Sequence, residues 1–133
     1  MSLTYADDKA VRGAELIELY REAGWSLLER RDPKRVEASI RGSERFFTAR
    51  DGSKLAGFIM ALSDGALYVH VSEFLVRQGY RDKGVERELL RRLLESVPEA
   101  ELVTLFGDPA DELVLREHGF TAYAGGLMRR QGR

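Results

Sequence analysis

The stretch Val76–Leu94, VRQGYRDKGVERELLRRLL, decides the fold, because an apolar strand changes into an amphipathic helix within it. Glycines 79 and 84 mark the change, and from Val85 the apolar residues recur at the spacing of a helix with one buried face. The start of such a helix presents backbone N–H groups without intrahelical partners and a partial positive charge. This turn therefore either holds a phosphate group or merely joins two elements.

The chain as a whole predicts one globular domain, residues 1–133. Hydrophobic residues make up 44% and charged residues 32%, with a formal net charge of −1, so nothing favours a nucleic-acid partner. The absence of cysteine excludes disulfides, thiolate nucleophiles and zinc–thiolate sites. His70 and His118 lack neighbours at ligand spacing, so we expect no metal. No apolar run reaches the roughly 20 residues that span a bilayer, and no leader is visible, so we expect a cytoplasmic protein without a membrane partner.

Apolar periodicity and capping residues predict four helices. The second and fourth begin at Asp-Pro pairs, in which the aspartate caps the helix and proline takes the first helical position. The predicted helices span residues 9–20, 33–42, 85–97 and 109–119.

The remaining apolar segments predict five strands. The first three follow one another through short turns and should form an antiparallel meander. The fourth follows a helical crossover and should lie parallel to the third. The predicted strands span residues 45–50, 55–62, 66–76, 101–106 and 120–128.

The residues Arg81-Asp82-Lys83-Gly84-Val85-Glu86 fit five of the six positions of a known signature, Arg or Gln, two residues, Gly, one residue, then Gly or Ala. Placed between a predicted strand and a predicted amphipathic helix, the motif resembles that of the GNAT superfamily of acyl-CoA-dependent N-acetyltransferases. LAGFIMALSDG (55–65) and REHGFTAY (116–123) resemble further segments of that family, so the resemblance covers most of the chain. It implies an α/β (α+β) fold with a mixed, mostly antiparallel sheet flanked by helices, splayed between the strand ending near Val76 and the strand ending near Phe106.

The resemblance also implies acetyl-CoA as co-substrate. The pyrophosphate would lie on backbone amides at the helix start, pantetheine would pair with the edge of the third strand, and an amide near Leu75 would polarise the thioester carbonyl. The basic side chains of Arg81 and Lys83 would add positive charge. The expected cofactor-binding residues are Phe74, Leu75, Val76, Arg81, Asp82, Lys83, Gly84, Val85, Glu86 and Arg87.

Glu86 departs from the signature, which has Gly or Ala at this position. Its carboxylate lies in the first helical turn, where it could bind the same N–H groups as a pyrophosphate and repel the cofactor. Two readings stay open: the side chain pairs with Arg81 or Arg87 and the cofactor binds, or the carboxylate closes the site.

Glu73 is the expected catalytic residue. Strict strand alternation places it on the same face as Val69, Val71 and Leu75, where an unpaired carboxylate is costly to desolvate. Such a place would raise its pKa and suit a general base that takes a proton from an amine. An ion pair with an arginine, or a bulge that turns Glu73 to solvent, would explain the residue equally.

The resemblance implies transfer of an acetyl group to a primary amine, on a small molecule or a protein, by direct attack in a ternary complex. The family's general-acid tyrosine is replaced by Leu115, so Tyr80, Tyr123 or solvent would have to donate that proton. The alternative is a catalytically degenerate domain that binds a ligand or partner. The sequence does not identify the amine acceptor. A homodimer is compatible with such a domain.

Overall fold

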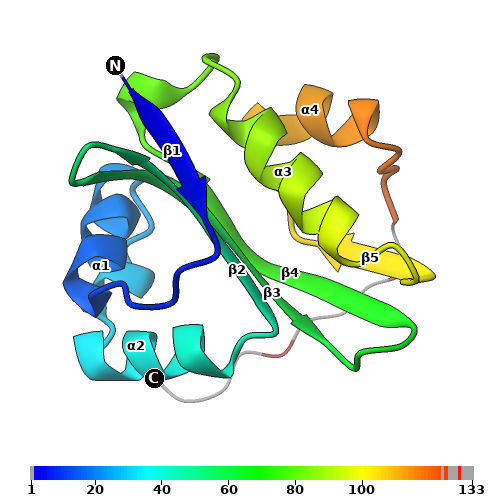
Figure 1. Ribbon diagram of the computed structural model, residues 1–133, viewed down its shortest axis with the longest axis horizontal. Helices are drawn as coiled ribbons and strands as arrows, with labels where there is room; N and C mark the ends of the chain where they lie inside the picture. Colours follow the sequence, from blue (N-terminus) through cyan, green and yellow to red (C-terminus); the bar gives the residue numbers. More distant parts are fainter. Residues whose placement is uncertain (1, 124, 126–128, 130–133) are drawn as a thin grey trace.

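The computed structural model describes residues 2–123, 125 and 129, and Figure 1 shows a sheet with α1 and α2 on one side and α3 and α4 on the other. The strands lie side by side in chain order. The strands are β1 (Leu3–Ala6), β2 (Arg45–Asp51), β3 (Lys54–Ser63), β4 (Tyr68–Val76) and β5 (Leu102–Leu105). The α-helices are α1 (Gly13–Glu22), α2 (Pro33–Gly42), α3 (Val85–Ser96) and α4 (Glu112–Glu117). Single 3₁₀ turns lie at Leu28–Arg30, Gln78–Tyr80 and Pro109–Asp111.

The predicted mixed sheet is confirmed. β2, β3 and β4 form the antiparallel meander, and β5 pairs parallel to β4. β1 was not expected from the sequence, and it pairs antiparallel with β2. Of the last predicted strand, residues 124 and 126–128 lie outside the described residues, and 120–123 and 125 form no strand. No helix within the described part is long and apolar enough to cross a membrane.

Each face of the sheet has its own hydrophobic core. On one face, α3 packs its buried side chains, including Val85, Leu89 and Leu93, against β2, β3 and β4. On the other face, α1 and α2 pack around Phe58 of β3 and Leu75 of β4. Burial of each large apolar side chain stabilises the fold by about 1.5–3 kcal/mol. The apolar stripe of α3 therefore fixes the helix start, and with it the turn after β4.

β4 and β5 separate halfway along β4. Their parallel pairing runs from Tyr68 opposite Leu102 to Val71 opposite Leu105, and residues 72–76 of β4 continue without a partner on that side. The predicted splay is thus confirmed, with the parallel pairing ending at Leu105. Backbone groups of this segment that point away from β3 have no strand partner in the described structure.

A β-bulge lies where the two strands part. Met60 of β3 is opposite Glu73, but the next residue of β3 is opposite Val71, so Ser72 is the extra residue on β4. A bulge bends its strand and increases the local twist. The bend coincides with the loss of pairing to β5 and so explains the splay.

The bulge corrects the predicted side of Glu73. Val69 and Val71 pack in the core beside α3, whereas Leu75 packs beside α1 and Glu73 bonds to a side chain of α1. Strict alternation failed because the extra residue interrupts the two-residue period of the strand. Glu73 therefore shares its face with Leu75 but not with the two valines.

Candidate active site

The turn between β4 and α3 presents a row of backbone amides. Gly84 caps α3 in the left-handed conformation, with φ of 85°, and Asp82 is also left-handed, with φ of 64°. The hydrogen bonds of the helix begin with Glu88 N–H donating to the Gly84 carbonyl at 3.0 Å. Within the described residues, the N–H groups of 82–87 donate to no acceptor. Such a row at a helix start is a general anion-binding arrangement.

Glu86 does not bind these amides. Its side chain is 7% exposed, and its Oε2 lies 3.6 Å from Nη2 of Arg81. The same Arg81 nitrogen donates a hydrogen bond to Asp111, the residue that precedes α4. The pairing with Arg81 that one of the two readings for Glu86 expects is present. Arg81 therefore already contacts two carboxylates, while exposed Lys83 forms no ion pair among the described residues.

Burial and charge act against each other in this cluster. Burial raises the pKa of Asp111, and the hydrogen bond and positive charge of Arg81 only partly oppose the rise. Burial alone would lower the pKa of Arg81, but the hydrogen bond and charge of Asp111 outweigh it and raise that pKa. The cluster joins the turn before α3 to the start of α4. Arg87 likewise joins the two helices through Glu117.

The strand before the turn is buried along its predicted cofactor segment, Phe74, Leu75 and Val76. The next residue, Arg77, is buried too, and its Nε donates to the Leu55 carbonyl at 2.6 Å. Its two remaining guanidinium nitrogens form ion pairs with Glu18 and Glu22 of α1. Arg77 thus fastens the end of β4 to α1, directly before the turn.

Glu73 is buried, 8% exposed, and both of its carboxylate oxygens are partnered. Tyr20 donates its hydroxyl to Oε1 at 2.5 Å, and Nη1 of Arg31 donates to Oε2 at 2.6 Å. Burial and the charge of Glu73 raise the pKa of Tyr20. Burial would lower the pKa of Arg31, but its hydrogen bond and ion pair with Glu73 raise it. The ion pair with an arginine that the sequence left open is therefore present, and Glu73 does not turn to solvent.

A cleft opens where β4 and β5 part. The space in it that water-sized groups can occupy is small, about 30 Å³. Glu73 of β4 and Asp111, which precedes α4, both line the cleft. The remaining lining residues are Trp25, Val71, Ser72, Phe74, Leu105, Phe106, Gly107 and Asp108.

The predicted proton donors lie elsewhere. Tyr80 donates its hydroxyl to Asp51 at 2.6 Å, and that hydrogen bond raises its pKa. Tyr123 is largely exposed, and neither tyrosine lines the cleft. Leu115 is buried in the core beside α3. The residues that line the cleft thus include three carboxylates, those of Glu73, Asp108 and Asp111, and no tyrosine hydroxyl.

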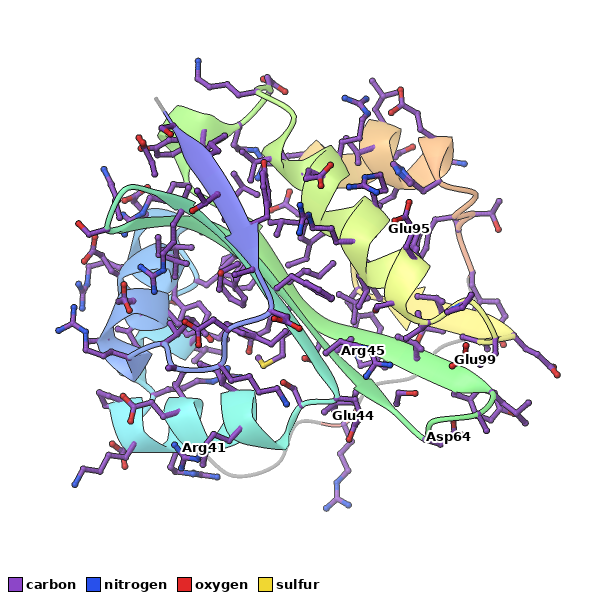
Figure 2. All side chains as sticks on the ribbon, in the orientation of Figure 1. Arg41, Glu44, Arg45, Asp64, Glu95 and Glu99 are labelled. Atoms are coloured by element: carbon purple, nitrogen blue, oxygen red, sulfur yellow. The ribbon has the colours of Figure 1, made fainter. Side chains whose placement is uncertain are left out.

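A second cleft lies at the far end of the sheet, beside the β3–β4 turn. Glu44, Arg45 and Glu99 line it, and Figure 2 labels all three. Arg45 donates to the Ser96 carbonyl at the end of α3, at 3.2 Å. No predicted site residue lies there.

Sequence reasoning missed three residues of the site. Tyr20 fits the apolar spacing of the predicted helix 9–20, which gives it no functional signal. Arg31 directly precedes the Asp-Pro pair that caps α2 and belongs to no motif. Asp111 follows another Asp-Pro pair and carries no motif. Only the expectation that Glu73 needs a partner could have pointed to an arginine, without identifying which one.

Comparisons with known proteins agree with this geometry. The profile of the acetyltransferase (GNAT) family matches residues 13–120. A GNAT family protein from Streptococcus pneumoniae superposes with a TM-score of 0.77 at 22% identity, covering 98% of this chain and 100% of the other. A Staphylococcus aureus protein gives 0.86 at 14%, with coverage of 98% and 100%. An aminoglycoside acetyltransferase from an uncultured soil sample, solved with sisomicin, gives 0.66 at 14%, with coverage of 99% and 95%.

No curated protein matches the chain. The structural likenesses, all below 25% identity, concern the fold alone. The profile match carries the family assignment because it spans most of the sequence, from the start of α1 to the residue after Gly119. The chain belongs to the GNAT acetyltransferase family.

Proposed function

We propose that this chain transfers an acetyl group from acetyl-CoA to a primary amine by direct attack in a ternary complex. The observation that carries the proposal is the row of amides of residues 82–87, which have no acceptor among the described residues and which follow Arg81, itself bonded to Asp111 of the cleft between β4 and β5. An anion at the helix start and an extended chain along the free edge of β4 would both find donors there. A cytoplasmic location and a homodimer remain predictions.

The residues have separate roles in this proposal. The amides of 82–87 and the exposed Lys83 hold the pyrophosphate, and the free edge of Phe74, Leu75 and Val76 binds pantetheine. The thioester supplies an activated acetyl group. An amide near Leu75 stabilises charge on the thioester oxygen during attack. Arg81 acts differently from the expectation, because it holds the turn to α4 rather than offering its charge to phosphate.

Glu73 accepts the proton that the attacking amine loses. Each carboxylate oxygen keeps a free lone pair after its bond to Tyr20 or Arg31, so proton acceptance needs no rearrangement of the strand. The chain contains no cysteine, which fits attack by the amine itself without a thiol ester on the protein. An amine ligand, sisomicin, is bound by the soil acetyltransferase of the same fold, which supports an amine acceptor here.

A thermal-shift titration with acetyl-CoA tests the proposal. Ligand that binds only the folded state stabilises it by about 2.7 kcal/mol at one hundred times its dissociation constant. We expect a saturable rise in melting temperature with acetyl-CoA, and release of free CoA when a panel of primary amines is added. A melting temperature that stays unchanged at millimolar acetyl-CoA would contradict the proposed transferase function.

A second candidate, a degenerate binding domain, is favoured by one observation. Arg81 is paired with both Asp111 and Glu86, so the turn has less free positive charge than its sequence suggests. This candidate predicts ligand binding without release of CoA for any amine in the panel. Turnover with any one amine would exclude it.

A further inference from the structure

Glu73 and Tyr20 together form a place suited to a cation. The carboxylate of Glu73 and the ring of Tyr20, 8% and 0% exposed, lie on neighbouring elements and are joined by a hydrogen bond. A buried carboxylate offers a charge-assisted hydrogen bond, and an aromatic face attracts a cation within about 6 Å of its centre. We call this pair the Tyr20–Glu73 box.

The cation now in the box is a side chain of the protein. Nη1 of Arg31 lies 2.6 Å from Oε2 of Glu73, and the guanidinium carbon lies 5.7 Å from the centre of the Tyr20 ring. Trp25 stacks on Tyr20, with ring centres 6.3 Å apart, and also lines the cleft. The box therefore adjoins the space between β4 and β5.

Arg31 is held less firmly than the groups it contacts. Its side chain is 46% exposed, and it comes from the connection between α1 and α2 rather than from a helix or strand. Within the described residues, its guanidinium donates one hydrogen bond, to Glu73, while its backbone N–H donates to the Leu28 carbonyl. If the guanidinium leaves the box, it enters water and regains hydration, whereas Glu73 stays buried and needs another cation.

Resting on the proposed function, we propose that the Tyr20–Glu73 box is the ammonium site of the acceptor and that Arg31 occupies it until the acceptor arrives. The acceptor ammonium replaces the Arg31 guanidinium at Oε2 of Glu73. It then passes one proton to that oxygen, so the nitrogen becomes a neutral nucleophile and Glu73 a neutral acid. The site selects a protonated primary amine on a narrow aliphatic stem, because one carboxylate oxygen and one ring face define it.

Removal of Arg31 should leave the box open for an added cation, which gives a test without acetyl-CoA. In Arg31→Ala, methylammonium chloride should raise the melting temperature saturably, relative to sodium chloride at the same ionic strength. In the parent protein the apparent affinity for methylammonium should be at least about tenfold weaker, because Arg31 competes with a charge-assisted hydrogen bond.

Three further variants make the result specific. Arg30→Ala removes the neighbouring exposed arginine, which does not contact Glu73, and should behave as the parent protein does. Arg31→Lys keeps a cation beside the box and should bind methylammonium weakly. Arg31→Ala combined with Glu73→Gln should lose the saturable shift, since the carboxylate is gone.

Equal responses of Arg31→Ala and the parent protein to methylammonium would overturn the inference. So would a saturable shift that survives in the variant that also carries Glu73→Gln. Either result leaves acetyl-CoA binding untouched, so failure of this inference is separable from failure of the proposed transferase activity.

Discussion

The proposed cofactor site and the proposed acceptor site are built from different chemical groups. On the proposed cofactor side, the turn before α3 offers backbone amides that no carboxylate of the described structure binds. On the proposed acceptor side, Glu73 accepts hydrogen bonds from the hydroxyl of Tyr20 and the guanidinium of Arg31. A site made of backbone amides depends on the local conformation of the chain, whereas a site made of side chains depends on how neighbouring elements pack. Substitutions should therefore act differently on the two sides.

The largest effect on the free energy of unfolding should come from the packing of α1 on α2. These helices carry the proposed acceptor side. A Cβ on Gly13 would lie 2.1 Å from the carbonyl oxygen of Pro33, so Gly13→Ala must push the two helices apart. We expect a loss of about 3 kcal/mol or more in unfolding free energy, measured by urea denaturation. Gly42→Ala is the control, since nothing lies within 4 Å of its Cβ and alanine favours helix. Equal stability of the two variants would show that the helices adjust freely.

The next effect should come from the conformation of the turn on the cofactor side. Gly84 has φ of 85° and open space around its Cβ, so Gly84→Ala meets backbone strain without a clash. The expected cost is about 1–2 kcal/mol in unfolding free energy, together with weaker binding of acetyl-CoA in calorimetry. Gly79→Ala in the same turn, with no left-handed φ and open space, should change neither quantity measurably. If both variants bind as the parent does, the backbone of the turn does not hold the cofactor.

A smaller effect, on the affinity for acetyl-CoA, should follow from removal of one negative charge near the amides of the turn. Glu86→Gln keeps the shape of the side chain but removes its repulsion of an anionic ligand, and it frees Arg81 from one of its two carboxylates. We expect acetyl-CoA to bind about fivefold more tightly, close to 1 kcal/mol. Glu95→Gln, near the other end of α3 (Figure 2), is the matched control and should leave the affinity unchanged. Weaker binding by the Glu86 variant would mean that its carboxylate helps to shape the site.

The smallest effect should come from the solvent face of α3. Hydrogen bonds from Arg91 and Arg92 lower the pKa of Glu88 from 4.5 to about 2. Because the pKa of Glu88 is lower in the folded chain, its ion pairs stabilise the fold above pH 4.5 and lose that contribution as the pH falls toward 2. The group is partly exposed, so Glu88→Gln should cost less than about 0.5 kcal/mol at pH 7, and less still in high salt. A difference that is undiminished at pH 2.5 would contradict this origin.

Local signals explain which parts of the fold could be predicted. Two such signals are the Asp32 cap, whose carboxylate accepts a hydrogen bond from Lys34 N–H, and the turn that ends at Gly84. Both act within a few residues, and both lie where the sequence indicates. The parallel strand β5 followed from the handedness and length of a helical crossover. β1 was missed because four residues are too few to show alternation above chance.

The acceptor side could not be predicted, because its contacts join residues far apart in the chain. Tyr20 and Glu73 are 53 residues apart, and Arg31 and Glu73 are 42 apart. Their meeting depends on how α1 packs across β4, and on a bulge that no residue type at Ser72 announces. The amides of the turn are a property of short-range backbone shape, so the sequence displays them. The side-chain network is a property of tertiary packing, so the sequence hides it.

The extra residue in β4 has a consequence for how such a strand tolerates change in length. Without Ser72, Val71 would be followed directly by Glu73, and the ladder with β3 would regain its regular register while every side chain kept its present face. The bend would be lost, and β4 could continue its parallel ladder with β5 past Leu105, which would seal the space between them. Replacement of Ser72 by another small residue would leave that space open. The opening is thus encoded by the count of residues in one strand, more than by their chemical identity.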